Sequence, residues 1–239
     1  MASDRTGDAP VLLITGASTG IGAATARQAV EAGWRVVLGA RSEDRLRELA
    51  TELGGEAHAL LRRCDVARFE DLEGLVATAL EGFGRLDAVF ANAGMGAGRG
   101  FLGESVEHWR EMVETNVLGV ALTIRAALPH LRDSRAGHFV ITGSVAGRRP
   151  LPGSLYSATK FAVGAMAESL RQEIRNDMPE ADLRVTLVSP GMVDTPFFDN
   201  RPDNALESAD VARAVLFALS QPPHVDVNEI LVRPVRQSS

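Results

Sequence analysis

The residues best suited to acid-base chemistry stand in one short segment. Tyr156 is the only tyrosine of the chain, and Lys160, four residues later, is its only lysine. On a helix this spacing puts both side chains on one face. A free tyrosine titrates at about pH 10, and a neighbouring ammonium would favour its phenolate and suit it to proton transfer. The simpler interpretation is a half-buried tyrosine beside a surface lysine, and the surrounding residues decide between the two.

A serine stands in the right place to join the pair. Ser144 follows an apolar run over residues 138–142, twelve residues before Tyr156. Ligands of open α/β sheets bind at the carboxyl ends of the strands, which is where this serine would lie. Its hydroxyl can hold the oxygen of a substrate, so the three side chains favour the catalytic interpretation.

A glycine-rich turn predicts a second kind of site. Residues 15–22 read T-G-A-S-T-G-I-G, directly after an apolar run over 11–15 and before a helical pattern. Glycines permit a tight turn and a close backbone approach, and the N–H groups of the next helix can donate to a pyrophosphate. The spacing differs from the general G-x-G-x-x-G fingerprint, and a glycine cluster by itself can be an ordinary turn.

The elements that must position these residues follow an alternating pattern. Short aliphatic runs alternate with longer amphipathic segments, which is typical of a parallel sheet covered on both faces. We expect an α/β, Rossmann-type doubly wound fold with a seven-stranded, mostly parallel sheet. The seven predicted strands cover residues 11–15, 35–38, 57–61, 86–91, 138–142, 183–188 and 229–232.

The sequence also predicts where two helices begin and how many domains the chain forms. Ser42 and Ser105 each precede acidic residues and are predicted to cap helices. The composition contains no repeat or linker, so we expect one dinucleotide-binding domain over residues 1–239, with a flexible N-terminus over 1–9. The late region from 190 to 204 is predicted to be a loop, too short for a further domain.

With these motifs in place, nearly the whole chain resembles the short-chain dehydrogenase/reductase family, and within it the small bacterial reductases that prefer NADP. The glycine turn matches the family's early motif, residues 92–94 match its N-A-G motif, and residues 189–195 match its proline-glycine motif. Two departures affect the pocket: Ala91 replaces a usual asparagine, and the family often has thirteen residues rather than twelve between its serine and its tyrosine.

The resemblance implies roles for individual residues. Asn116, Ser144, Tyr156 and Lys160 match the family's catalytic tetrad. The implied cofactor-binding residues are Gly16, Ser18, Thr19, Gly20, Ile21, Gly22, Arg41, Asp65, Val66, Asn92, Ala93, Gly94, Tyr156, Lys160, Pro190, Gly191, Val193 and Thr195.

The implied reaction is hydride transfer between NADP(H) and a carbonyl or secondary alcohol. Tyr156 would exchange a proton with the oxygen that Ser144 also binds. Lys160 would bind the ribose, and Asn116 would hold a water of a proton relay. No metal is expected. A regulator of the same fold that binds NADP without chemistry, and an epimerase or dehydratase that regenerates its cofactor, remain alternatives.

The preference for NADP(H) follows from the end of the second predicted strand. Dinucleotide folds bind the ribose 2′-hydroxyl with an acid there, whereas an arginine accommodates a 2′-phosphate. Ala40 occupies the place of that acid, and Arg41 follows it. The simpler interpretation is that Arg41 is a solvated residue, and Thr19 stands where many NADP-using relatives carry a second basic residue.

The composition limits the kinds of binding partner and the cellular compartment that we expect for the protein. The net charge of −6 disfavours a general role on nucleic acid, which needs a basic face. A single cysteine, Cys64, cannot form an internal disulfide and is expected to be a buried thiol. No apolar stretch reaches the length of a membrane span, so we expect a cytoplasmic protein that binds neither membrane nor nucleic acid.

The sequence indicates the substrate pocket and the assembly only in outline. We expect a small-molecule substrate and a homo-oligomer, a tetramer or dimer, formed through long helices over residues 105–131 and 153–176. Arg148 and Arg149 could meet an acidic substrate, although adjacent loop arginines are usually solvated. The expected pocket walls are mainly apolar and comprise Met95, Val145, Leu151, Met192, Phe197 and Phe198.

Overall fold

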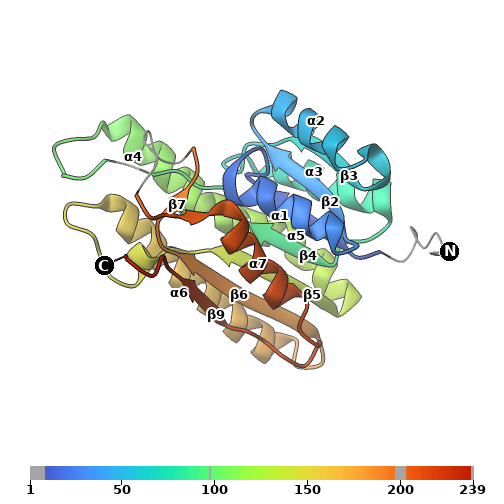
Figure 1. The fold of residues 1–239 in the computed structure, drawn as a ribbon. Coiled ribbons are helices and arrows are strands. Elements are labelled where there is room, and N and C mark those ends of the chain that lie inside the picture. Colours follow the sequence, from blue (N-terminus) through green and yellow to red (C-terminus); the bar gives the residue numbers. More distant parts are fainter. Residues whose placement is uncertain (1–8, 97, 197–202, 238–239) are drawn as a thin grey trace.

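The computed structural model describes residues 9–96, 98–196 and 203–237. A seven-stranded sheet runs through its centre in the order β3-β2-β1-β4-β5-β6-β9, with helices on both sides (Figure 1). All registered strand pairs of this sheet are parallel. The expected doubly wound fold is therefore confirmed, and the described part of the sheet is wholly rather than mostly parallel.

The elements follow one another along the chain as expected for repeated β-α units. The strands are β1 Val11–Thr15, β2 Arg35–Ala40, β3 Ala59–Arg63, β4 Ala88–Ala91, β5 Ala136–Thr142, β6 Asp182–Pro190, β7 Val193–Asp194, β8 Leu206–Glu207 and β9 Glu229–Val232. The helices are α1 Gly20–Glu31, α2 Glu43–Glu52, α3 Phe69–Phe83, α4 Val106–Val113, α5 Gly119–Ser134, α6 Leu155–Asp177 and α7 Ser208–Leu219. Three short helical turns complete the list: η1 Gly55–Ala57, η2 Glu114–Leu118 and η3 Val145–Gly147.

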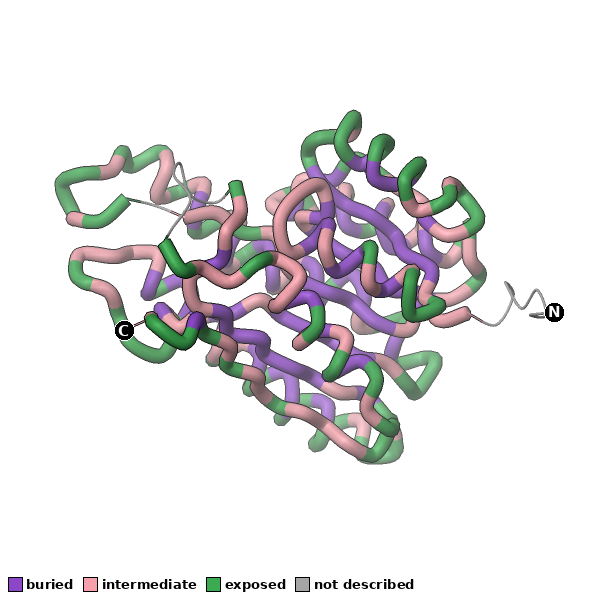
Figure 2. Tube along the Cα trace, in the orientation of Figure 1, coloured by how far each residue is buried: buried purple, intermediate pink, exposed green. Residues whose placement is uncertain are grey.

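Two apolar layers hold the sheet between its helices. Alternate residues of a strand point to opposite faces, so Leu12 and Ile14 pack with α1, α2 and α7, whereas Val11 and Leu13 pack with α3, α5 and α6. Figure 2 shows the central strands as a continuous buried band inside a more exposed shell of helices. The long aliphatic runs of the sequence thus fill both faces of one sheet, as the parallel arrangement requires.

The predicted elements match the structure with a few differences. The third strand begins at Ala59 rather than at residue 57, because Gly54 and Gly55 adopt positive φ and lead into the turn η1. The late loop contains one further parallel pair, β7 with β8. Ser105 caps α4 by accepting from the His108 N–H at 3.1 Å, whereas Ser42 occupies the N-cap of α2 without a side-chain bond.

The long helix predicted over residues 105–131 is interrupted by a wider turn. Residues Glu114–Leu118 form the π-helical segment η2 between α4 and α5, and this segment contains Asn116. Single π turns inside helices often mark functional sites, because they shift a side chain out of the regular helical register.

β1 and β4 are neighbours in the middle of the sheet, and the strand order reverses between them. The strands that follow β1 in the chain, β2 and β3, extend the sheet to one side, whereas those that follow β4 extend it to the other side. In open α/β sheets such a switch point forms the ligand-binding crevice at the carboxyl ends of the strands. The glycine turn follows β1 at this point. Among the residues that the structure describes, none of the helices combines the length and apolar character that crossing a bilayer requires.

Candidate active site

The glycine turn after β1 is built for close approach. Gly16 has a φ of 65°, and a Cβ there would lie 2.8 Å from the Cα of Ala93. At Gly22 a Cβ would lie 2.3 Å from the Gly16 carbonyl oxygen. Because both positions exclude a side chain, the turn packs directly against the N-A-G segment after β4. The structure therefore brings these two sequence motifs together.

Asn92 fastens the ends of three strands to one another. Its Nδ2 donates to the Thr15 carbonyl at 3.1 Å, and its Oδ1 accepts from the Thr142 hydroxyl at 3.2 Å. The Thr15 hydroxyl oxygen in turn accepts from the backbone N–H groups of Asn92 and Ala93 at 3.1 Å and 3.2 Å. Asn92 thus holds the carboxyl ends of β1, β4 and β5 in register below the crevice.

The N-terminus of α1 has the character of an anion site. Thr19 is its N-cap residue and makes no side-chain cap bond, and the first turn carries no acid. The helix dipole and the N–H groups of the first turn therefore remain available to a negative group. With the side-chain-free surface at Gly16 and Gly22, the residues present fit the pyrophosphate of a dinucleotide.

The proposed catalytic side chains meet at the start of α6. Tyr156 shares a side-chain hydrogen bond with Ser144. The Lys160 Nζ lies 5.8 Å from the centre of the Tyr156 ring and donates to the Thr142 carbonyl at 2.8 Å. Gly147 allows this approach, because a Cβ there would lie 2.7 Å from the Lys160 carbonyl oxygen. The turn η3 and helix α6 therefore fix Ser144 against Tyr156.

Burial decides the protonation of this pair. Tyr156 keeps partial exposure, yet burial raises the pKa of its phenol to about 12, against a smaller opposite effect of the Ser144 hydrogen bond. Burial also lowers the pKa of the Lys160 ammonium to about 8. The expectation that the pKa of the phenol would be lowered is wrong for this structure, because desolvation by burial is the largest cause of the shift and raises that pKa. At neutral pH Tyr156 accordingly holds its proton.

Asn116 lies beside the same group of residues. A Cβ on Gly94 would lie 3.3 Å from the Asn116 Oδ1 and 3.8 Å from the Lys160 Nζ. The buried Asn116 amide donates to the Met95 carbonyl at 2.8 Å and to the Thr159 hydroxyl at 3.2 Å. Both amide hydrogens are therefore taken by protein groups, and a water at this residue would need the remaining lone pair of Oδ1 or the backbone.

The loop after β6 closes the crevice from the other side. Pro190 ends β6, Gly191 follows it, and Val193 lies in the short strand β7. A Cβ on Gly20 would lie 3.1 Å from the Thr195 methyl carbon, so this loop reaches the glycine turn. The proline-glycine motif and the glycine turn, which are far apart in the sequence, thus face each other.

Three of the residues expected to bind the cofactor, Arg41, Asp65 and Val66, have partners within the protein. The exposed Arg41 forms an ion pair with Glu111 of α4, with Nη1 and Oε1 2.8 Å apart. Asp65 closes its own turn by accepting from the Ala67 N–H at 3.0 Å. Val66 is buried, and its Cγ2 would lie 2.7 Å from a Cβ on Gly119, so it packs against α5.

The surroundings of the glycine turn include a cavity and a core contact that are not evident from the sequence. A cavity of about 220 Å³ lies beside Ser18 and is lined by Arg27 and Arg45, among other residues. Ile21 is half-buried and packs into the core below the turn. Arg45 is exposed on α2 and lines this cavity together with Ser18, so it offers a further cation beside the turn.

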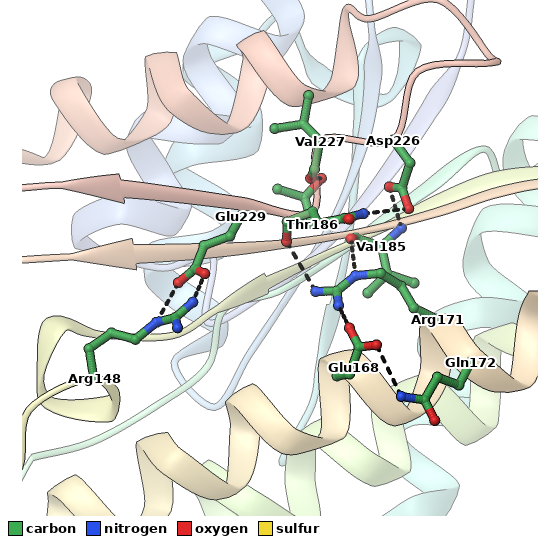
Figure 3. Close-up of polar contacts among 10 residues, drawn as sticks. Arg148, Glu168, Arg171, Gln172, Val185, Thr186, Asp226, Val227 and Glu229 are labelled. Carbon is green, nitrogen blue, oxygen red and sulfur yellow. Dashed lines mark hydrogen bonds and ion pairs between the residues drawn. The ribbon is translucent and has the colours of Figure 1, made fainter.

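A polar network joins the turn after Ser144 to β9 and joins α6 to β6. Figure 3 shows Arg148 reaching Glu229 on β9, and the Nε to Oε1 distance is 2.7 Å. The Ser189 hydroxyl donates to the same carboxylate at 3.3 Å. The buried Arg171 of α6 donates to the Val185 carbonyl at 3.0 Å and so ties the helix to β6. A cavity of about 540 Å³ lies beside this network, and Ser144 and Lys160 are among the residues that line it.

Comparison with known proteins decides the family. The model of the short chain dehydrogenase family matches residues 10–205. The chain belongs to this family. An uncharacterised oxidoreductase of Staphylococcus saprophyticus is 36% identical over 242 residues, which cover 95% of this chain and 97% of the relative. The protein is thus an oxidoreductase of the short-chain dehydrogenase/reductase type, a class that acts on CH–OH and C=O groups.

Solved structures agree with this assignment. An alcohol dehydrogenase from the archaeon Thermococcus sibiricus, complexed with 5-hydroxy-NADP, has a TM-score of 0.87 and 34% identity, covering 97% of this chain and 99% of that one. A serine dehydrogenase from Escherichia coli has a TM-score of 0.84 and 32% identity, covering 96% and 100%. Similar structures hold NADP in some cases and NAD or NADH in others.

Several interactions of this short-chain dehydrogenase were beyond sequence reasoning. Glu111 as the partner of Arg41 and Glu229 as the partner of Arg148 are 70 and 81 residues distant in the chain. Charge alone did not mark them, because acids are frequent on exposed helices and edge strands. Phe197 and Phe198, expected in the pocket wall, lie outside the described residues.

Proposed function

We propose that the protein, as one dinucleotide-binding domain, transfers a hydride between NADP(H) and a carbonyl or secondary alcohol, with Tyr156 as the proton donor or acceptor. The observation that carries the proposal is the hydrogen bond between the phenol of Tyr156 and the hydroxyl of Ser144, with the Lys160 ammonium beside the ring. Bound NADP(H) would supply or receive the hydride.

The residues of the chain then perform the proton chemistry. The Ser144 hydroxyl binds the substrate oxygen, and Tyr156, which holds its proton at neutral pH, delivers it to that oxygen during reduction. Two donors aimed at the same oxygen stabilise the negative charge that develops there. Lys160 contributes its positive charge to the site and would bind the nicotinamide ribose. Asn116 supports this arrangement by holding the backbone of Met95 through both its amide oxygen and its amide nitrogen.

The decisive experiment compares the parent protein with Tyr156→Phe in a cofactor-coupled screen of ketones, aldehydes and alcohols. The variant retains the ring and loses only the hydroxyl, so we expect the rate to fall by about 10² to 10⁴ while cofactor binding stays nearly the same. Equal turnover in both proteins would remove Tyr156 from this role. Cofactor binding without turnover on any substrate would favour the regulatory alternative, and substrate conversion without net cofactor consumption an epimerase or dehydratase.

The preference for NADP(H) is a separate part of the proposal. No carboxylate stands at Ala40 to repel a 2′-phosphate, and Arg41 and Arg45 supply cations on either side of Ser42. Guanidinium groups bind phosphate through paired hydrogen bonds, so a modest movement of Arg41 away from Glu111 would make it a ligand. We expect tighter binding of NADPH than NADH, a loss of NADPH affinity in Arg41→Ala, and a reversal in Ala40→Asp. Tighter NADH binding in the parent would refute the preference.

A homo-oligomer is also proposed. Exposed apolar side chains lie along the long helices, and they include Val113, Leu118 and Phe161, which are 41%, 45% and 44% exposed. Such side chains cost free energy in water and favour contact with another copy. Light scattering at micromolar concentration should give the mass of a dimer or tetramer, and a monomer mass would exclude the proposal.

A further inference from the structure

Gln237, the last residue that the structure describes, reaches back to the loop that leaves β6. Its side-chain Oε1 accepts a hydrogen bond from the backbone N–H of Met192 at 3.0 Å. The tail makes a turn to allow this, since the Gln237 N–H donates to the Pro234 carbonyl at 3.0 Å. One residue earlier in the loop, the Gly191 N–H donates to the Val232 carbonyl at 2.7 Å. The C-terminal segment therefore lies directly on the proline-glycine motif.

The tail and the loop are in close contact at Gly191. A Cβ at position 191 would lie 2.1 Å from the Gln237 Oε1 and 3.0 Å from the Pro234 Cδ. A side chain at position 191 would displace the Gln237 carboxamide and crowd the Pro234 ring. Gly191 thus leaves open the space through which Gln237 reaches Met192.

Both backbone polar groups of Met192, the N–H and the carbonyl, form hydrogen bonds. Its N–H binds Gln237, and its carbonyl accepts from the Leu206 N–H at 2.9 Å. The chain continues from there through β7 to Thr195, which lies against Gly20 of the glycine turn. Met192 and Thr195 are three residues apart. A shift of Met192 would therefore also move Thr195, which lies where the loop faces the dinucleotide crevice.

The two residues just before Gln237 add little to the hydrophobic core. Val235 is fully exposed and Arg236 is exposed, so the residues just before Gln237 face solvent. We propose that Gln237 is a positioning residue, whose carboxamide oxygen holds Met192 so that residues 193–195 face the glycine turn in the geometry that binds the nicotinamide dinucleotide. This inference rests on the proposed function.

The test uses the full chain and two variants of the same residue. Gln237→Met keeps the length of the side chain and removes the acceptor, whereas Gln237→Glu keeps an acceptor oxygen in the same place. One neutral hydrogen bond corresponds to a change of about three- to tenfold in an equilibrium constant. We expect the Kd for NADPH and for NADH to rise by this factor in Gln237→Met and to stay within about twofold of the parent in Gln237→Glu. Arg236→Ala, at the exposed neighbouring position, should leave both Kd values unchanged.

Two further measurements separate positioning from a general structural role. In hydrogen exchange of the cofactor-free protein, the Met192 amide should exchange faster in Gln237→Met, while the melting temperature falls by no more than about 5 °C, the loss expected for one hydrogen bond. Unchanged cofactor binding in Gln237→Met, or equal weakening in Arg236→Ala, would overturn the inference and leave the proposed function intact. A parent protein that binds neither dinucleotide would overturn both.

Discussion

Burial of His138 should make the stability of the fold depend on pH. This histidine of β5 is 1% exposed, and its Nε2 lies 2.7 Å from the Thr186 hydroxyl oxygen. Because that hydroxyl donates its own hydrogen to the Val227 carbonyl at 2.6 Å, its oxygen must accept from Nε2–H. Its Nδ1 has no hydrogen-bond partner among the described residues. Burial, with the nearby Arg184 cation, lowers the pKa of His138 from 6.5 to about 3.

The sign of the effect follows from the two pKa values. Between pH 6.5 and about 3 the unfolded chain binds a proton at this histidine and the folded chain does not. The free energy of unfolding therefore falls as the pH falls, by about 1.4 kcal/mol per pH unit. Between pH 7 and pH 5 the loss amounts to about 2 kcal/mol, because only the part below the unfolded pKa counts.

Urea unfolding of the parent and of His138→Gln at pH 7 and pH 5 measures this loss. Glutamine can still donate to Thr186 but does not titrate, so the stability advantage of the parent over the variant should shrink by about 2 kcal/mol at the lower pH. His130→Gln, at an exposed position of α5, controls for the removal of an imidazole. A difference between parent and His138→Gln that is the same at both pH values would refute the reasoning.

Three predictions concern the site itself. Glu111→Gln should release Arg41 from its exposed ion pair with Glu111. Because such pairs contribute at most about 1 kcal/mol, we expect NADPH binding to tighten by up to about fivefold in a fluorescence titration. An equal gain in affinity for NADH would contradict this prediction. Gly147→Ala should destabilise the protein by about 1–3 kcal/mol in denaturant unfolding, because the added Cβ meets the Lys160 carbonyl; unchanged stability and kcat would show that the turn can move. Because the pKa of Tyr156 is raised to about 12, alcohol oxidation, which needs the phenolate, should accelerate with pH by about tenfold per unit below about pH 8, where Lys160 keeps its charge. Carbonyl reduction should stay nearly constant over the same range, and pH-independent oxidation in steady-state assays would contradict the prediction.

Some expectations were confirmed because they depend on short-range patterns. The aliphatic runs, such as residues 11–15, alternate with amphipathic segments, and in a parallel sheet each run must be buried on both faces. Cys64 is buried as expected, and the glycine turn after β1 lies at the reversal of strand order. Local steric limits, hydrophobic periodicity and strand-helix alternation are properties that neighbouring residues carry by themselves.

Other features were decided only by the tertiary structure. The sequence predicted that a cation beside Tyr156 would lower the pKa of the phenol, but the packing around α6 desolvates the group and raises that pKa. Arg41 looked free for a phosphate, and folding places Glu111 next to it. Gly191 matched a motif, and only the course of the C-terminal tail shows that Gln237 occupies the space beside it. The sequence by itself determined the order of strands and helices and the types of reactive groups, because these follow from local chemistry. Desolvation, ion pairing and steric contact between distant segments depend on how the whole chain packs, and this is why the protonation state and the bracing of the site required the structure.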